Sequence, residues 1–344
     1  MSNKAAVVEQ IGSPVVIKTV ERYTPGPDEI LVKNKVINFT PLAAKMQKFA
    51  PIPYKPPVIL GFSSAGIVEE VGGNVTYVKP GDRVAVLTVF DLSDRHGHFQ
   101  EYYIANPQFT SKIPDGVSLE DASSVPANLA TVVAVMQALH GPERPSPDGK
   151  KAAPNGKKLL VYGGSSSVGG YAVKYGADLG YDVVTTSSPA NRDYVASLGA
   201  GSVVDHRQPA EKVVADLKAL GPFDGVVDTI GTAEQTAILG QVLAEQKDDI
   251  TIFTMLPEVG DAAAYATPAH VKRVYQSWPQ VLETPEMKDV LEWTYHVYIP
   301  EGLASGAIIP TRNEEMAGGI DGIQAILDKS LEGGVSGKRL ITLV

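Results

Sequence analysis

The chain turns at Gly163-Gly164-Ser165-Ser166-Ser167-Val168-Gly169, between an apolar run that starts at Leu159 and a segment with helical spacing. Apolar residues from Val168 to Leu179 recur at steps of four, three and four, which places them on one helical face. Small residues between a strand and a helix let a phosphate approach the backbone N–H groups at the helix N-terminus. The turn therefore predicts a dinucleotide-binding site that includes Gly164, Ser165, Ser166, Ser167, Val168 and Gly169.

The turn departs from the usual Gly-x-Gly-x-x-Gly pattern, because Ser166 takes the place of the middle glycine. Its serine hydroxyls can add hydrogen bonds to a phosphate. Taken alone, such a motif can also be a glycine-rich turn that binds nothing. The strands and helices that follow it favour binding.

Downstream of the turn, apolar strands alternate with helical segments, which is typical of a parallel sheet covered by helices. The predicted strands are Leu159–Gly163, Asp182–Thr186, Ser202–Asp205, Gly225–Ile230 and Ile250–Met255.

The second predicted strand ends in Thr186-Ser187-Ser188, where an NAD-binding domain would place a carboxylate against the ribose 2′-hydroxyl. No carboxylate there repels a 2′-phosphate, Ser187 and Ser188 can donate hydrogen bonds, and Arg192 supplies a nearby positive charge. This combination favours NADPH as the cofactor. The alternative is that Ser188 caps the next helix and Arg192 is a solvated charge, and both interpretations can hold together.

The N-terminal third consists of short apolar runs broken by glycine and proline, which predicts a mostly β domain. Residues 118–139 have a helical pattern, and a polar loop with four prolines follows at residues 140–158. Near the C-terminus a helical spacing runs from Met316 to Leu327, and Arg339 to Val344 are predicted to form a terminal strand.

The composition sets limits on function. A chain of 344 residues predicts two domains, and its net charge of −9 argues against a nucleic-acid partner. The absence of cysteine excludes disulfides, thiolate catalysis and a four-cysteine zinc lobe. The first ten residues lack a basic segment followed by an apolar core, and no apolar stretch is long enough to cross a membrane. We therefore expect a soluble cytoplasmic protein.

Six motifs spread over nearly the whole chain carry a family resemblance. They are Gly61–Gly72 (GFSSAGIVEEVG), Lys79–Val84 (KPGDRV), Gly97–Tyr102 (GHFQEY), the turn at 163–169, Val227–Gly231 (VDTIG) and Ser336–Lys338 (SGK). With these motifs the sequence resembles the zinc-independent branch of the medium-chain dehydrogenase/reductase family, in particular its quinone oxidoreductase-like and fungal trans-acting enoyl reductase members.

The resemblance implies an α/β protein in which a Rossmann-type, doubly wound parallel sheet domain is inserted into a mostly β, GroES-like catalytic domain. The inserted NADP-binding domain would span residues 126–299. The catalytic domain would comprise residues 1–125 and 300–344, and the active site would lie in the intervening cleft.

The resemblance also assigns residues within the cofactor site. The turn from Gly164 to Gly169 would hold the phosphates, and Ser187, Ser188 and Arg192 the 2′-phosphate. The nicotinamide side would be bordered by Thr254, Met255 and Leu256. His206 takes the place of a tyrosine common in this branch, and His206-Arg207 can still stack on or pair with the nucleotide.

No metal site is predicted. Zinc-dependent relatives carry Gly-His-Glu where this chain has Gly61-Phe62-Ser63, and the usual first cysteine falls near Thr40. His96 and His98 are the only substitutes nearby, and their glycine-rich surroundings favour exposed loop histidines over metal ligands.

The proton donor stays open between three candidates. The family segment Asn-Pro-x-Asp-x-Lys is here Thr40-Pro41-Leu42-Ala43-Ala44-Lys45, which loses the asparagine and the aspartate but keeps the lysine. Lys45, Tyr54 or a bound water can supply the proton.

The resemblance implies an NADPH-dependent, zinc-independent reductase that transfers hydride to the β-carbon of an enone or enoyl thioester, in polyketide-type secondary metabolism. Its partner would be a small molecule, free or tethered to an acyl carrier, and the protein would be a monomer or homodimer. One alternative is a quinone or aldehyde reductase, distinguished by the pocket around Phe39, Phe49, Tyr54 and Tyr265. Another is a non-redox protein or partner subunit that keeps the fold, suggested by the loss of aspartate at Ala43.

Overall fold

The computed structural model describes residues 2–333 and 335–344, which form two compact units. The first comprises the chain up to Ala127, Asp289–Ser305 and the chain from Pro310 onward, and the second comprises Asn128–Lys288 and Gly306–Ile309. Residues 289–299, which the sequence assigned to the inserted domain, group with the first unit.

The second unit is built on a six-stranded parallel sheet with the order β11-β10-β9-β12-β13-β14. Its strands are β9 (Lys158–Tyr162), β10 (Asp182–Ser187), β11 (Ser202–Asp205), β12 (Gly225–Asp228), β13 (Ile250–Thr254) and β14 (Val271–Tyr275). This order is that of a Rossmann dinucleotide-binding sheet, in which the strand order reverses between the first strand and the fourth. The reversal lies here between β9 and β12.

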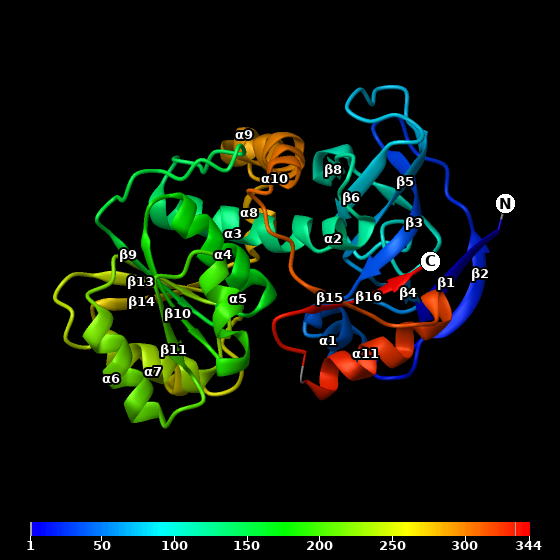
Figure 1. Ribbon diagram of the computed structural model, residues 1–344. Helices are drawn as coiled ribbons and strands as arrows, with labels where there is room; N and C mark the ends of the chain where they lie inside the picture. Colours follow the sequence, from blue (N-terminus) through cyan, green and yellow to red (C-terminus); the bar gives the residue numbers. More distant parts are fainter. Residues whose placement is uncertain (1, 334) are drawn as a thin grey trace. The chain divides into compact units, whose positions relative to one another are not determined.

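Helices cover both faces of this sheet (Figure 1). On one face Leu160 and Tyr162 of β9 join a core formed with α6 (Ala210–Leu220) and α7 (Ala233–Leu243). On the other face Leu159 lies against Gly176 of α4 (Ser167–Asp178). The predicted doubly wound α/β arrangement is thereby confirmed. The remaining helical segments of the unit are α3 (Val125–His140), which begins in the first unit, η2 (Pro189–Asn191), α5 (Arg192–Ser197), η3 (Ala262–Tyr265), α8 (Trp278–Val281) and η4 (Pro285–Met287).

The first unit is mostly β, as predicted. A seven-stranded sheet has the order β15-β16-β3-β5-β6-β8, with β7 also paired to β3, and a second sheet has the order β2-β1-β4. The strands are β1 (Ser2–Val8), β2 (Val16–Glu21), β3 (Ile30–Asn38), β4 (Val58–Ile59), β5 (Ser63–Val71), β6 (Arg83–Leu87), β7 (Tyr102–Ala105), β8 (Thr110–Lys112), β15 (Asn313–Glu315) and β16 (Arg339–Leu343).

The C-terminal strand completes the N-terminal sheet. β16 runs antiparallel to β3, with Ile341 opposite Asn38, and buried Arg339 donates from Nε to the Asn38 side chain at 3.1 Å. The predicted terminal strand is therefore confirmed, and it joins the sheet formed by β3 and the strands that follow it.

Short-range sequence features explain where the helical segments of the first unit begin. α1 (Pro41–Phe49) begins at Thr40, whose hydroxyl caps the Ala43 N–H, with proline at the first helical position. The predicted helix from Met316 begins later, as a 3₁₀ turn (η6, Gly319–Gly322) followed by α11 (Ile323–Glu332). The other segments are η1 (Pro107–Phe109), α2 (Leu119–Ser123), α9 (Lys288–Glu292), η5 (Trp293–Tyr298) and α10 (Ile299–Ser305).

The segment η5 is a π-helix between α9 and α10. Pro300 has no N–H to donate to the carbonyl four residues earlier, and its ring would collide with that carbonyl in a regular α-helix. The wider turn accommodates the proline, and the Ile299 N–H accordingly reaches the carbonyl of Thr294, five residues back. No helix within the described ranges has the length and apolar character needed to cross a membrane.

α11 anchors the core of the first unit through Ile323, Ile326 and Leu327, which are all fully buried. We expect Leu327→Ala to lower the free energy of unfolding of this unit by about 2–5 kcal/mol, because truncating a fully buried side chain leaves a cavity in the core. Chemical denaturation followed by circular dichroism measures the change. Glu332→Ala, on the exposed end of the same helix, is the matched control and should change stability by less than about 0.5 kcal/mol.

Candidate functional site

The turn at 163–169 is anchored to the neighbouring strand β10. The N–H groups of Gly163 and Gly164 donate to the side chain and the carbonyl of Thr186, at 2.8 and 3.0 Å. Gly163 has φ +89°, and a Cβ on Gly164 would lie 2.1 Å from the Thr185 hydroxyl. Both positions therefore require glycine.

Ser166 explains the departure from the three-glycine pattern. It is the N-cap of α4, and its hydroxyl accepts from the Gly169 N–H at 2.9 Å. A Cβ on Gly169 would lie 2.2 Å from the Gly163 carbonyl, so turn and helix pack without room for a side chain. The other N–H groups of the first turn, at Ser167 and Val168, have no acceptor within the helix. These two N–H groups are the ones from which a dinucleotide phosphate would accept, and phosphate binding here stays a prediction.

Thr229, which follows β12, fixes the turn from the opposite side. Its hydroxyl lies within 3.0 Å of the carbonyls of Tyr162 and Gly163 and 2.8 Å from the Ser166 hydroxyl. Thr229 lies at the point where the strand order reverses, the place where such sheets bind their ligands. Thr229 lies in the family motif Val227–Gly231, but no role was predicted for it from the sequence.

The predicted 2′-phosphate residues lie at the carboxyl end of β10. Ser187 and Ser188 are 1% and 3% exposed. Among the described residues, the Ser187 hydroxyl donates to the Ser188 carbonyl and the Ser188 hydroxyl accepts from Asn191, both at a long distance of 3.4 Å. Arg192 opens α5, is exposed, and forms no ion pair with any residue that the structure describes. Ser188 occupies the cap position of η2, yet its hydroxyl makes no capping bond, so the helix-cap alternative does not account for it.

His206 and Arg207 are exposed and directly follow β11, whose last residue, Asp205, pairs with Ser187. His206, which replaces the family tyrosine, therefore lies at the same carboxyl end of the sheet as Ser187 and Ser188.

The residues predicted to border the nicotinamide end β13 and begin its loop. Buried Thr254 accepts from Trp278 Nε1 through its carbonyl at 2.7 Å, and the Met255 N–H donates to the Asp228 carbonyl at 3.1 Å. The Leu256 carbonyl accepts from Arg273 of β14 at 2.8 Å. The sequence did not indicate a role for Arg273, because β14 was not among the predicted strands.

Asp228 ties the end of β12 to its own loop. Its fully buried carboxylate accepts from the N–H groups of Ile230 and Gly231, both at 3.0 Å. Burial raises the pKa of Asp228, while these two hydrogen bonds and the nearby Arg273 charge act in the opposite direction.

Lys45 and Tyr54 both belong to the α1 region of the first unit. Lys45 is exposed on α1. The partly buried Tyr54 hydroxyl donates to the carbonyl of Met46 at 2.9 Å, and burial raises the pKa of this tyrosine.

The four aromatic residues expected to distinguish substrates have different surroundings within their own units. Phe39 stacks on Phe99 in the core at 5.3 Å, and Phe49 is 67% exposed. Tyr265 belongs to the second unit, where it lies under Arg273.

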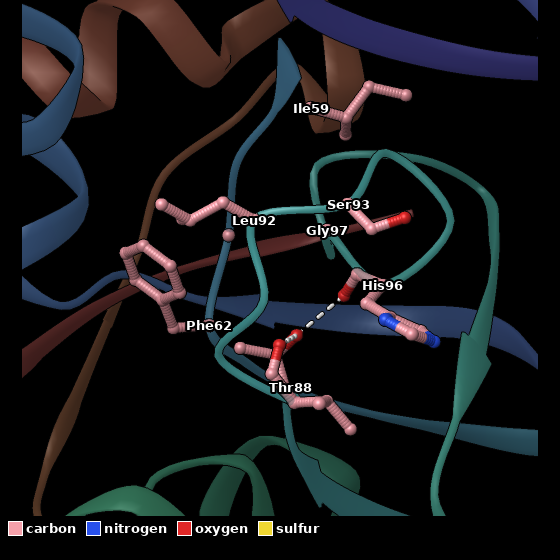
Figure 2. A pocket seen from close by; sticks show the side chains of 9 residues that line it. Ile59, Phe62, Thr88, Leu92, Ser93, His96 and Gly97 are labelled. Carbon is pink, nitrogen blue, oxygen red and sulfur yellow. Dashed lines mark hydrogen bonds between the residues drawn. The ribbon is translucent and has the colours of Figure 1, made fainter. Parts of the chain in front are cut away.

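A small pocket of about 10 Å³, room for roughly one water molecule, lies in the first unit (Figure 2). Its lining includes Phe62, which takes the place of the family's zinc-binding histidine and packs on Phe90 with ring centroids 5.2 Å apart. The Ser63 hydroxyl is fully buried and donates to the Ser123 carbonyl at 2.8 Å. Neither side chain is available to a metal ion.

His96 and His98 have different surroundings. The His96 ring lies on the side of the pocket away from Phe62 (Figure 2), where its Nδ1 is 2.8 Å from Asp91. The prediction of exposed loop histidines is wrong for both residues. The His96 side chain is only 12% exposed, and His98 is fully buried and stacks on Tyr103 at 4.0 Å. Within residues 2–333 and 335–344, no three His, Asp or Glu side chains are grouped so as to hold a metal ion.

The comparisons with known proteins agree with this architecture. The alcohol dehydrogenase GroES-like domain family matches residues 26–115. A zinc-binding alcohol dehydrogenase domain-containing protein, cipB of Emericella nidulans, is 30% identical, with 100% of this chain and 99% of the relative covered. The chain belongs to the medium-chain dehydrogenase/reductase family.

Further members of this oxidoreductase family are similar over the full length. The trans-enoyl reductase tndF of Aspergillus flavipes is 29% identical, with 98% of each chain covered. The solved structure of mycobacterial Rv1454c complexed with NADPH has a TM-score of 0.76 at 20% identity, with both chains covered completely, which shows a shared fold.

The buried His98 predicts a loss of stability in acid. Burial lowers its pKa to about 3, whereas the unfolded chain has a histidine pKa near 6.5. Between these pH values the unfolded state binds the extra proton, so the free energy of unfolding should fall by up to about 1.4 kcal/mol per pH unit as the pH drops. Denaturation curves at several pH values measure this slope. His98→Phe should reduce it, and the exposed His206→Phe should not.

Proposed function

We propose that the protein is an NADPH-dependent reductase. The observation that carries the proposal is the end of β10, where two serines and an exposed arginine stand in place of a carboxylate. The Ser187 and Ser188 hydroxyls make long hydrogen bonds of 3.4 Å, and Arg192 forms no ion pair with the residues that the structure describes. A 2′-phosphate needs such donors and positive charge, and a carboxylate would repel it.

Several parts of the chain would hold the cofactor. The turn Gly164–Gly169 would bind the pyrophosphate, while His206 and Arg207 would contact the adenosine end. The loop from Thr254 to Leu256 would border the nicotinamide. When bound, the dinucleotide supplies the hydride.

We propose an activated alkene as the substrate, an enone or an enoyl thioester, free or tethered to an acyl carrier in polyketide-type secondary metabolism. The similarity to tndF, a trans-enoyl reductase, supports this class. The apolar pair of Phe62 and Phe90 also suits an alkene better than it suits a metal-bound alcohol. We further propose that the protein is cytoplasmic, that it is a monomer or a homodimer, and that it has no nucleic-acid partner.

Protonation of the α-carbon is assigned to Lys45, Tyr54 or water. The Tyr54 hydroxyl would first have to leave the Met46 carbonyl. The exposed Lys45 side chain makes no hydrogen bond or ion pair with the described residues. This difference favours Lys45 or water as the donor.

The donor set at the family's zinc position does not fit zinc. Phe62 is apolar, the Ser63 hydroxyl is committed to a backbone carbonyl, and the chain has no cysteine. In conjugate reduction, negative charge spreads into an enolate whose oxygen can be held by backbone N–H groups or a hydroxyl. The proposed reaction therefore runs without a metal.

We expect Arg192→Ala to weaken NADPH binding about ten- to hundredfold, because a charge-assisted contact contributes roughly 1.5–3 kcal/mol. NADH binding should barely change. Fluorescence titration measures both affinities. Lys157→Ala, an exposed lysine just before β9 at the opposite end of the strands, is the control. Equal affinity of the unaltered protein for NADH and NADPH would contradict the cofactor proposal.

Activity should survive exhaustive chelation. NADPH oxidation is measured with an enone, an enoyl thioester, a quinone and an aldehyde, alongside elemental analysis of the purified protein. Full enone or enoyl activity without stoichiometric zinc supports the proposal. Activity that disappears on chelation and returns with zinc overturns the proposal. Faster turnover of the quinone or the aldehyde identifies the alternative reductase. If NADPH is not oxidised with any acceptor, a non-redox role is favoured.

A further inference from the structure

Arg273 carries a buried charge at the carboxyl edge of the sheet. It belongs to β14, and its side chain is only 5% exposed. Its Nη2 donates to the Leu256 carbonyl at 2.8 Å and the Gly231 carbonyl at 3.2 Å, and it lies 3.4 Å from the Thr254 hydroxyl. One guanidinium therefore contacts the loops that follow both β12 and β13.

The remaining neighbours of Arg273 stabilise its position. The guanidinium carbon lies 4.8 Å from the centre of the Tyr265 ring, and Nη1 lies 3.7 Å from the Glu258 carboxylate. Arg273 also acts on the charge of buried Asp228, whose carboxylate receives the Gly231 N–H at 3.0 Å. The N–H of Gly231 is thus held by a carboxylate, and its carbonyl by a guanidinium.

The two loops are in direct contact where Arg273 joins them. Gly231 has φ +73°, and a Cβ built on it would lie 2.8 Å from Cβ of Leu256. A small displacement of either loop would therefore move the other. Burying a cation is costly unless it is hydrogen-bonded or paired with a charge. An apolar residue at this position of β14 would avoid that cost. The contacts of Arg273 favour a role in fixing these loops.

We propose that Arg273 is a positioning residue for the nicotinamide half of the cofactor site. It holds the carbonyls of Gly231 and Leu256 so that the loop Thr254–Leu256 is rigid before the cofactor arrives. The inference rests on the proposed function, since it takes this loop as the border of the nicotinamide. The adenosine half, at the end of β10, does not depend on Arg273.

The test compares two ligands that share the adenosine half. Binding of NADPH and of 2′,5′-ADP, which lacks the nicotinamide, is measured by calorimetry for Arg273→Met, Arg273→Lys and the unaltered protein. We expect the methionine variant to bind NADPH about tenfold more weakly and to lose about ten- to a hundredfold in kcat, because small misplacements of a reacting group are costly. Binding of 2′,5′-ADP should change less than about twofold. The lysine variant, which keeps the charge, should recover part of both losses.

Two controls make the result specific. Lys272→Met removes a cation from the neighbouring, exposed position of β14 and should leave both affinities unchanged. Arg192→Ala should weaken NADPH and 2′,5′-ADP alike.

Two outcomes for the Arg273 variants overturn the inference. One is that they bind NADPH as tightly as the unaltered protein with the same kcat. The other is that both variants lose both ligands together, because Arg273 then supports the whole unit. If the unaltered protein binds neither ligand, the proposed function itself fails.

Discussion

The proposed cofactor site depends on one constraint, the absence of room for a Cβ at Gly164 and Gly169. With a side chain at either position, the turn would be pushed away from Thr185 or from its own Gly163 carbonyl. The turn's hydrogen bonds to Thr186 and Thr229 would then be lost, and α4 would begin in a different direction. The phosphate-facing N–H groups belong to the first turn of this helix, so their position is set by backbone packing and not by any phosphate ligand.

The first unit depends on a pairing between distant parts of the chain. β3 is central to its sheet and pairs with β5, β7 and β16, so the N-terminal strands are incomplete until the last residues join them. The segment from Asn128 to Lys288 can be inserted between β3 and β16 because the sheet requires only that β16 pairs with β3. The Arg339–Asn38 hydrogen bond fixes this return in a buried setting, where a shifted register would leave both side chains without their partner.

The sequence predicted the parallel strands β9 to β13 because each contains a short apolar run between helical segments, a pattern that needs no knowledge of the partner strands. In β9, β10 and β12 nearly every residue of the strand is buried. β14 was missed for the opposite reason. It is an edge strand whose residues Lys272, Arg273 and Tyr275 are polar or partly exposed, so its sequence has no apolar run. The role of Arg273 could not be predicted with its strand missing. His98 was misjudged because its burial comes from β3 and Tyr103, which its own glycine-rich neighbours do not indicate.

The two halves of the proposed cofactor site achieve rigidity by different chemistry. At the phosphate end, Ser166 caps its own helix and uses the Gly169 N–H, leaving the N–H groups of Ser167 and Val168 for a ligand. At the other end, Arg273 and Asp228 hold the carbonyl and N–H of Gly231 through ionic hydrogen bonds. A hydroxyl suffices in the turn because glycine packing already limits its conformations. The loops after β12 and β13 are joined by the hydrogen bonds of Arg273 and Asp228, and these charged contacts supply the order that glycine packing supplies in the turn.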